Sequence, residues 1–584
     1  MPAAARGGRA GAGRLDTALD RLGGGLDRLL AWAVARRGRA VALVALVAGL
    51  AVLPGLFALP VTARDEARFV QATKQMMETG DLVDIRFQDR PRWKKPIGIY
   101  WLQAAAALPF GAERAGVWAY RLPSALAVVL AALATVWAAR PLVSARAAVL
   151  AGLALPLAVL VAVEATIAKT DASLMLTAVV AFGALARALT GQAGRWDWLW
   201  FWLAIAAAVL LKGPIVPLVA LLATGAFWAL SGRRPALATL RPLPGLALAG
   251  VLVAPWLVAI TIESDGAFFA ESIGQDLLGK VAEGQEKHWG PPGLYAAIVW
   301  GTFWPLASLL PGALAFAWAR RRETAVMIAC AWVVPFWLVL EAVPTKLPHY
   351  VLPLYPALAI LVAAYVEDGV PPVRRWLAWT MAVLAALPGV ALGLAALALP
   401  LVLEGRVLWP AALLGLAGAA LALLAARAAL DGRLRAQAAA GGLASAAILW
   451  SALQFGLPAL DTPFATPRLM ALVERARPCG AGPLVSLGYR EPSLVFRAGI
   501  DTRLADAEET AGRLIERPGT LALVENARRD DLDAALARRS GGSPPALRAL
   551  GEARYFNYNR GRFETASLLV RDLQRFDACT PPRG

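Results

Sequence analysis

The chain of 584 residues is 58% hydrophobic and 17% charged, and it carries a formal net charge of +17. Many apolar runs reach the roughly 20 residues that cross a bilayer as a helix, which excludes a soluble protein and predicts a polytopic α-helical membrane protein. The positive charge does not indicate a nucleic-acid partner, because most of the arginines lie in short loops, where they set the orientation of membrane helices.

The N-terminal segment 1–38 is basic. Within it, residues 14–32 are weakly amphipathic, and we expect them to lie along the inner leaflet of the membrane. The glycines at 23, 24 and 25 weaken the case for one continuous helix there. The first apolar run, 40–60, is too long for a cleaved signal peptide and has no small-residue cleavage site after it. We therefore interpret it as a retained membrane anchor.

A transmembrane domain is expected over residues 39–457, with about thirteen helices. Their centres lie near residues 49, 131, 154, 180, 204, 222, 252, 304, 334, 358, 391, 419 and 446. Only Lys212-Gly213-Pro214 separates the helices near 204 and 222, so a single kinked helix is the alternative. We favour two helices, because the run is too long for one crossing.

The loop arginines predict the orientation of these helices. Arginines cluster before the first helix and in every second loop, which places those loops and the N-terminus on the cytoplasmic side of the membrane. The basic loops lie at 140–146, 187–195, 233–234, 320–322, 374–375 and 433–435. A long periplasmic loop is then expected at 61–118, and an odd number of crossings places the C-terminus in the periplasm.

Residues 458–584 have a different composition, which predicts a small periplasmic α/β domain. Short β-type runs at 483–489, 493–496, 520–524 and 567–570 alternate with helical stretches near 467–476, 504–516 and 527–538. Cys479 and Cys579 belong to this domain, and we expect a disulfide between them in an oxidising compartment. The absence of a Walker A pattern and of a dinucleotide fingerprint argues against an ATP-driven pump and a nicotinamide enzyme.

Three polar clusters lie at the expected outer edge of the membrane, and ionisable groups beside transmembrane helices indicate a functional site. They are Asp65-Glu66, 92–96 and 169–171. A carboxylate there is suited to deprotonate an acceptor hydroxyl, and lysines are suited to bind a phosphate. The alternatives are that the acids cap helices and that the lysines extend their ammonium groups to the interface.

His288 and His349 are the only histidines in the chain, and both fall in expected outer loops. A loop histidine is usually solvated. Because both lie on the face that is expected to carry the acids, we consider a functional role and a solvated position as equal alternatives.

Several motifs resemble those of bacterial lipid-A aminoarabinose transferases, which belong to the protein-mannosyltransferase-like superfamily of membrane glycosyltransferases with the GT-C fold. The resemblance covers most of residues 60–365 in order. It is carried by Asp65-Glu66-Ala67-Arg68-Phe69, Glu78-Thr79-Gly80-Asp81, Lys95-Pro96 to Tyr100-Trp101, Arg121-Leu122-Pro123-Ser124, Lys169-Thr170-Asp171, Leu211-Lys212-Gly213-Pro214, Lys280-Val281 to Gly293 and Lys346-Leu347-Pro348-His349-Tyr350.

The resemblance implies a transferase that takes a sugar from a polyprenyl-phosphate carrier on the periplasmic side. It implies that Asp65 is the catalytic carboxylate and Asp171 a second essential acid. Lys95 and Lys212 would hold the donor phosphate, and His288 would line the same cavity. We add Glu66 as a candidate acid and Arg68, Tyr100, Lys346 and His349 as candidate substrate ligands.

We expect an inverting single displacement in which Asp65 accepts the proton of the acceptor. The acceptor could be lipid A, another glycolipid, a glycan or a protein. No cofactor is expected. Relatives tend to carry an acid where this chain has Lys94, which makes a divalent metal doubtful. The alternatives are a transporter or flippase of an anionic polyprenyl lipid and a non-catalytic subunit of polysaccharide assembly. The absence of an internal repeat argues against a transporter.

Overall fold

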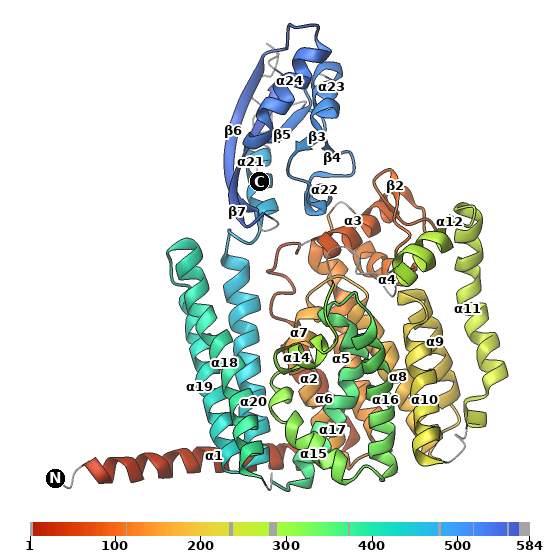
Figure 1. Cartoon of the computed structure of the whole chain (residues 1–584), viewed down its shortest axis with the longest axis vertical. Coiled ribbons are helices and arrows are strands. Elements are labelled where there is room, and N and C mark those ends of the chain that lie inside the picture. Colours follow the sequence, from red (N-terminus) through yellow and green to blue (C-terminus); the bar gives the residue numbers. More distant parts are fainter. Residues whose placement is uncertain are drawn as a thin grey trace. The chain divides into compact units, whose positions relative to one another are not determined.

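A computed structural model describes residues 4–62, 64–112, 114–232, 237–279, 289–371, 374–476, 481–517, 519–557 and 560–571 (Figure 1). His288 and the predicted Cys479–Cys579 disulfide lie outside these residues. The chain divides into two compact units. Unit 1 comprises Met1–Ala58, Asp81–Ile85 and Arg92–Gly456, and unit 2 comprises Leu59–Gly80, Arg86–Pro91 and Leu457–Gly584.

Unit 1 is a bundle of helices. Its α-helices are α1 (Ala4–Val34), α2 (Arg37–Val52), α4 (Gly98–Ala107), α5 (Val117–Ala139), α6 (Ala145–Ala154), α7 (Val159–Ala165), α8 (Asp171–Leu189), α9 (Asp197–Lys212), α10 (Ile215–Ser231), α11 (Pro242–Glu263), α12 (Ala267–Phe269), α14 (Leu294–Thr302), α15 (Leu310–Ala319), α16 (Thr324–Ala342), α17 (Tyr355–Asp368), α18 (Arg375–Glu404), α19 (Trp409–Leu430) and α20 (Leu434–Leu449). Segments of 3-10 helix join them, among them η2 (Leu155–Leu157), η5 (Leu306–Ser308) and η6 (Pro348–Leu354), and segments of π-helix form η4 (Ala270–Leu278) and η7 (Trp450–Gly456).

Eight helices among the described residues are long and apolar enough to cross a membrane, and the bent pair Ala145–Leu157 and Val159–Ala165 would add a ninth. The chain is therefore a multi-pass membrane protein. Helices α11 and α18 expose large apolar side chains such as Leu243, Ile262 and Val402, a surface that suits lipid and not water. The count of about thirteen transmembrane helices stays a prediction.

The run between 197 and 231 forms two helices, α9 and α10, which lie side by side in Figure 1. Gly213 between them has a φ of +71°, a conformation that glycine adopts without steric cost, and Pro214 follows it. This break confirms two helices and excludes the single kinked helix.

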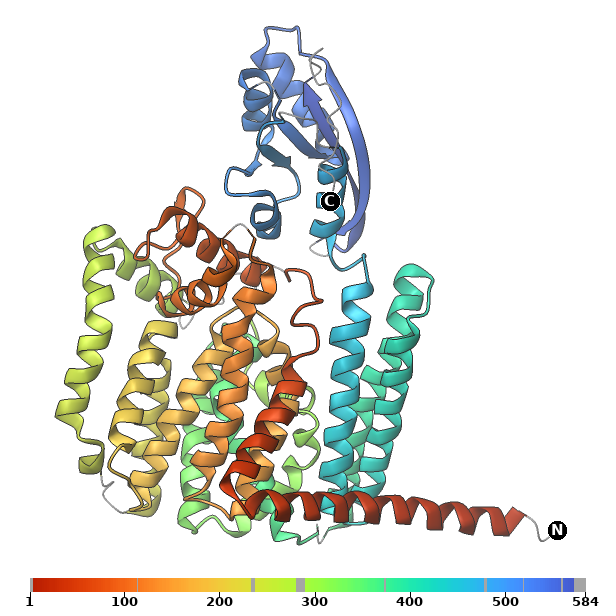
Figure 2. The same cartoon turned by 180° about the vertical axis from the view of Figure 1, so that it is seen from behind.

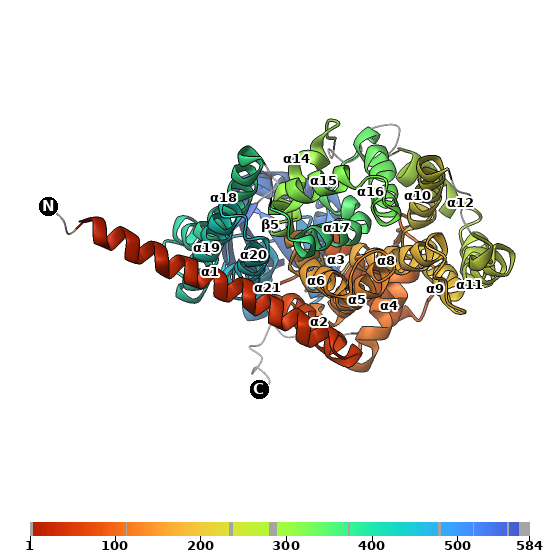
Figure 3. The same cartoon turned by 90° about the horizontal axis from the view of Figure 1, so that it is seen from below.

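Helix α1 continues unbroken through the three glycines, although they weakened the expectation of one helix. It runs across the ends of α20, α6 and α2 (Figure 3), and α2 leaves it at an angle (Figure 2). Leu19, Leu30 and Ala33 are buried on its inner side. The apolar face of α1 therefore belongs to the core of unit 1.

Small residues let the bundle helices approach closely, as is common in membrane proteins. A Cβ atom on Gly393 of α18 would lie 2.4 Å from the carbonyl oxygen of Gly415 in α19. In return, a Cβ atom on Gly415 would lie 2.7 Å from the carbonyl oxygen of Gly393. Neither position has room for a side chain, so these glycines set the spacing of the two helices.

Unit 2 contains a five-stranded sheet with the strand order β4-β3-β5-β7-β6. β3 pairs in parallel with β4 and β5, whereas β7 pairs antiparallel with β5 and β6. The elements are α3 (Arg64–Thr79), β1 (Arg86–Phe87), β2 (Arg90–Pro91), α21 (Ala465–Ala476), β3 (Leu484–Leu487), α22 (Pro492–Ala498), β4 (Arg503–Ala505), α23 (Ala507–Glu516), β5 (Leu521–Glu525), α24 (Arg529–Arg539), β6 (Leu547–Asn557) and β7 (Arg562–Arg571).

Helices cover both faces of this sheet. α21 packs with Leu484 and Leu521 on one face, and α23 and α24 pack with Ala522 and Val524 on the other. β3 and β5 are buried along their whole length, which explains why their sequences are mostly apolar.

The strand expected at 493–496 is wrong, because these residues belong to the helix α22. Pro492 lies in the first turn of this helix, where its fixed φ and missing N–H favour a helix start. Gly499 ends it with a φ of +108°. Likewise the helix expected from 504 begins later, at Ala507, because Arg503–Ala505 forms the edge strand β4.

Candidate active site

Five ionisable side chains from five segments of unit 1 form one buried cluster, here called the charged cluster. Glu164 lies in α7, Lys169 in the following turn, Asp171 at the start of α8, Lys212 at the end of α9 and His349 in η6. An acid at a helix start and a lysine at a helix end also suit the helix dipoles. The fold brings the five side chains together because the segments that carry them lie at the same end of the helix bundle.

Each side chain of the charged cluster contacts at least one other. Lys212 donates a hydrogen bond to Oδ1 of Asp171, and Lys169 lies 2.8 Å from Oε1 of Glu164. The other oxygen of Asp171 lies 3.7 Å from both Lys169 and Nε2 of His349. Glu164 and Asp171 are only 4% and 3% exposed. Buried charges are costly, and groups of them in membrane proteins indicate function.

The contacts also define the protonation of His349. Its Nδ1 atom lies 3.2 Å from the Lys169 ammonium, which can only donate a hydrogen bond. Nδ1 therefore accepts, and the proton of the neutral imidazole lies on Nε2, facing Asp171. The ring packs edge-on against Tyr350, and the ammonium of Lys212 lies 5.0 Å from the centre of the Tyr350 ring. His349 is thus held by contacts on several sides.

Lys95 makes an ion pair in unit 1 with a partner outside the charged cluster. It lies just before α4, and its ammonium donates a hydrogen bond to Oδ2 of Asp276 in η4. Both side chains are largely buried, at 19% and 10% exposure. Tyr100, in the first turn of α4, is fully buried. The ammonium of Lys95 is therefore paired with a carboxylate and is not solvated.

Lys346 is occupied by the backbone. Its ammonium donates to the carbonyl oxygens of Leu340, Glu341 and Val343, each at 2.9 Å. These three bonds use all the donors of an ammonium and satisfy the last turn of α16. Burial lowers the pKa of Lys346, and the Glu341 carboxylate opposes this shift. The geometry favours a helix cap for Lys346 over a substrate ligand.

Asp65, Glu66 and Arg68 lie in the first turns of α3, in unit 2, and the two acids differ in environment. Glu66 is 1% exposed and accepts hydrogen bonds from the N–H and the hydroxyl of Thr62, at 2.7 and 2.8 Å. The side chain of Asp65 is 58% exposed and lies 3.7 Å from Arg68. Glu66 therefore acts as the helix-capping acid, while the carboxylate of Asp65 stays accessible.

Sequence reasoning did not single out Glu164 and Asp276. Glu164 lies in an apolar stretch and Asp276 in the segment between two apolar runs, and neither belongs to a recognisable motif. Lys169 belongs to the motif Lys169-Thr170-Asp171, but the sequence analysis assigned a functional role only to Asp171. In the described part of the chain, no group of three metal-ligating side chains of the His, Cys, Asp and Glu types comes together. His288 lies outside that part.

The sequence matches known proteins in the region that carries these charges. The profile of the dolichyl-phosphate-mannose-protein mannosyltransferase family matches residues 94–258, a range that contains Lys95, Asp171 and Lys212. The undecaprenyl phosphate-alpha-4-amino-4-deoxy-L-arabinose arabinosyl transferase of Edwardsiella ictaluri is 28% identical over 315 residues, 52% of this chain and 55% of that protein. The transferase of the same name from Aeromonas salmonicida is 29% identical over 322 residues, 53% and 56% of the two chains. The chain thus matches about half the length of these curated relatives.

Solved structures show the fold. ArnT from Cupriavidus metallidurans in the apo state superposes with a TM-score of 0.69 at 18% identity, covering 90% of this chain and 97% of that one. The same protein bound to undecaprenyl phosphate gives a TM-score of 0.68 at 18% identity, with the same coverage. The GT-C fold expected from the motifs is confirmed. The chain has the fold of ArnT, and its sequence resembles aminoarabinose transferases of that kind.

Proposed function

We propose that the protein is a membrane glycosyltransferase that moves a sugar from a polyprenyl-phosphate donor to an acceptor. The observation that supports this most is the charged cluster, in which two lysines are held together at one end of a membrane bundle. A polyprenyl phosphate is a good leaving group, so transfer requires no nucleotide. Ammonium groups close to the departing phosphate stabilise the charge that develops on it.

In this proposal the acids of the charged cluster position the lysines. Both oxygens of Asp171 face cations or His349, so this carboxylate is better arranged to orient Lys169 and Lys212 than to accept a proton. Two lysines and two acids balance each other before the donor binds. The donor phosphate would then compete with the carboxylates for the same ammonium groups. Lys95 with Asp276 is a second candidate contact for the phosphate.

Asp65 is proposed as the general base that deprotonates the acceptor. Two observations support this role, namely its place in the motif shared with the transferases and the exposure of its carboxylate. An exposed carboxylate is accessible to an acceptor hydroxyl, and general base catalysis requires direct contact with the proton. The single displacement that we expect inverts the anomeric centre.

The relatives guide the choice of substrate. Their names specify undecaprenyl phosphate aminoarabinose as the donor, so this is the first donor to test. The proposed acceptor is lipid A, and the alternatives are another glycolipid, a glycan or a protein. We propose no cofactor, and a divalent metal stays doubtful because Lys94 occupies the position of an acid in relatives.

We also propose that the chain crosses a bacterial inner membrane about thirteen times, with a cytoplasmic N-terminus and a soluble periplasmic α/β domain at its C-terminus. Contacts between the basic loops support one shared face. Arg146 lies 3.0 Å from Glu367, and Arg433 lies 3.2 Å from Asp16 of α1. Loops that the positive-inside rule assigns to the cytoplasm therefore meet at one end of unit 1.

The proposal is tested with purified full-length protein, undecaprenyl phosphate aminoarabinose and lipid A in detergent. We expect release of undecaprenyl phosphate together with a modified acceptor, both measured by mass spectrometry. An assay in liposomes distinguishes the transferase from the alternative, a flippase. Movement of the intact donor across the bilayer without release of its sugar would contradict the transferase proposal.

A further inference from the structure

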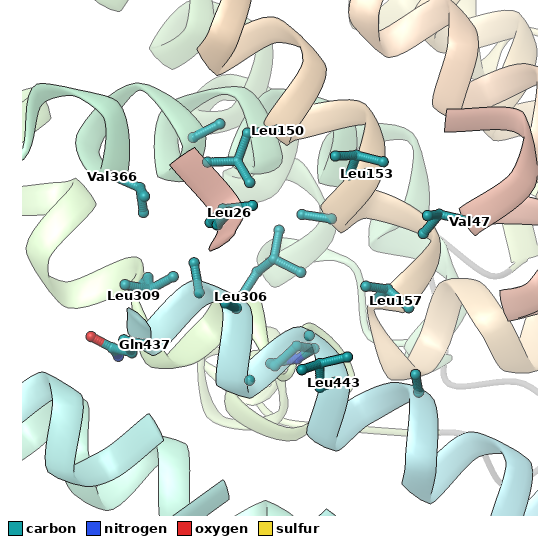
Figure 4. A pocket seen from close by; sticks show the side chains of 18 of the residues that line it. Leu26, Val47, Leu150, Leu153, Leu157, Leu306, Leu309, Val366, Gln437 and Leu443 are labelled. Atoms are coloured by element: carbon teal, nitrogen blue, oxygen red, sulfur yellow. The ribbon is translucent and has the colours of Figure 1, made fainter. Parts of the chain in front are cut away.

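Unit 1 contains an apolar cavity of about 570 Å³, a size typical of small-molecule sites. Figure 4 shows leucine and valine side chains from different helices around a common space, among them Leu26, Leu150, Leu306, Val366 and Leu443. The lining comes from α1, α2, α6, α17, α20 and the η5 turn.

The cavity is separate from the charged cluster. Residues of α17 from Ala359 to Val366 line it, whereas His349 precedes that helix. Ala359 follows His349 by ten positions in the chain, which corresponds to roughly 15 Å of helix rise. On α6 and η2 the lining ends at Leu157, before Glu164 of α7. The cavity therefore lies toward the end of the bundle where α1 lies.

The lining offers almost nothing to a polar solute. Gln437 donates to the carbonyl oxygen and the hydroxyl of Ser308, both at 3.3 Å, and the indole N–H of Trp450 donates to the carbonyl oxygen of Leu50. Apart from these two side chains, Arg21 is the one polar residue of the lining. A space of this kind suits a hydrocarbon chain and not water.

Ion pairs fix α1 as the wall of the cavity. Asp16 and Asp20 of α1 pair with Arg433, at 3.2 and 3.6 Å. Asp27 pairs with Arg146 and, at 3.4 Å, with Arg435. Among the described residues no ion pair involves Arg21, which lies on the same helix and is exposed at the cavity. The acids of α1 are thus used to hold the helix, and Arg21 keeps its charge for another partner.

We propose that this cavity binds one hydrocarbon chain of an anionic phospholipid, with the headgroup phosphate at Arg21. The apolar lining accounts for the chain, and the guanidinium accounts for the anionic headgroup, since arginine pairs well with phosphate oxygens. Gly25 of α1 lines the cavity, and a Cβ atom there would meet nothing within 4 Å. The missing side chain leaves part of the room that the lipid chain fills. Glycines inside a helix are unfavourable for its stability, and the space for a lipid chain gives a reason for Gly25 in the amphipathic helix α1.

The test is native mass spectrometry of the full-length protein in detergent with added phosphatidylglycerol or phosphatidylethanolamine. Gly25→Leu fills the cavity without a backbone clash. Its matched control is Gly13→Leu on the same helix, where a Cβ atom also meets nothing within 4 Å and which does not belong to the lining of this cavity. Arg21→Ala removes the headgroup contact, and Arg14→Ala is the control for charge on α1.

We expect the wild type and both controls to retain one phosphatidylglycerol that Gly25→Leu does not retain. Arg21→Ala should bind it about five-fold more weakly, as expected for one basic residue at an anionic headgroup. Three results would each overturn the proposal. These are full binding by Gly25→Leu, equal binding of phosphatidylethanolamine by the wild type, and displacement of phosphatidylglycerol by undecaprenyl phosphate at equal concentration.

Discussion

The ammonium of Lys169 lies 2.8 Å from the carboxylate of Glu164, five positions earlier in the chain. The bend between α6 and α7, which measures 63°, turns the last residues of α7 so that Glu164 joins the turn before α8. Glu164, which belongs to no motif, thereby becomes the partner of Lys169 in the charged cluster. The local sequence gives no sign of this pairing.

Glu164→Gln is expected to destabilise the protein by about 1.5–3 kcal/mol, the contribution of a hydrogen bond to a charged group. The reason is that Lys169 loses its nearest anion while it stays buried. Thermal unfolding in detergent measures the effect. Glu263→Gln, an exposed acid at the end of α11, is the control and should unfold like the wild type. Equal stability of the two variants would contradict a structural role for the Glu164–Lys169 pair.

The pair of Asp171 and Lys212 is expected to show strong coupling. Asp171→Asn or Lys212→Met alone leaves an uncompensated buried charge, which costs about 3–5 kcal/mol. The double variant removes both charges and should cost less than the sum of the single variants, with a coupling of about 0.5–3 kcal/mol. Denaturant unfolding of the four proteins gives the cycle. Additive losses would show that the two side chains do not act as a pair.

Asp65→Asn is expected to fold normally but to lose sugar transfer. An amide cannot accept the proton, and loss of general base catalysis alone lowers turnover about 10²–10⁴-fold. Glu66→Gln is the comparison, because Glu66 is buried and its carboxylate is bonded to Thr62. It should keep far more turnover than Asp65→Asn. Normal turnover by purified Asp65→Asn would return Asp65 to the role of a helix cap.

Lys95→Ala is expected to raise the KM for the polyprenyl-phosphate donor. One lost contact to a charged group corresponds to about 1.5–3 kcal/mol of donor binding. Lys94→Ala should raise it less, since Lys94 lies outside the matched position of the motif. Steady-state kinetics at several donor concentrations separates the two variants. If both behaved alike, the register of the Lys-Pro motif would be wrong.

The proposed orientation of the membrane helices predicts the behaviour of fusions at the C-terminus. Alkaline phosphatase attached after Gly584 should be active, because this enzyme requires an oxidising compartment for its disulfides. A green fluorescent protein attached there should stay dark. The reverse result would place the C-terminus in the cytoplasm and remove the assignment of the charged cluster to the periplasmic side.

The sequence was most informative where a motif coincides with a helix end. Asp171, Lys212 and His349 were chosen from their loops, and the structure brings them together because α8, α9 and η6 share one end of the bundle. It was least informative about partners. Whether Lys346 faces a substrate or three carbonyl groups depends on how α16 ends, and whether 493–496 pairs in a sheet depends on its neighbours. Such choices are made by tertiary contacts, which local patterns do not contain.

Helix α3 is synthesised long before the residues that it contacts in unit 2. Lys74 donates to the carbonyl oxygen of Phe496, 422 positions later, and Arg64 lies 3.5 Å from Glu491. At bacterial rates of translation this interval lasts roughly 20–80 seconds. During that time α3 lacks the contacts that it makes with α22. Completion of unit 2 is therefore expected to be a late step of biogenesis, which follows the synthesis of α22.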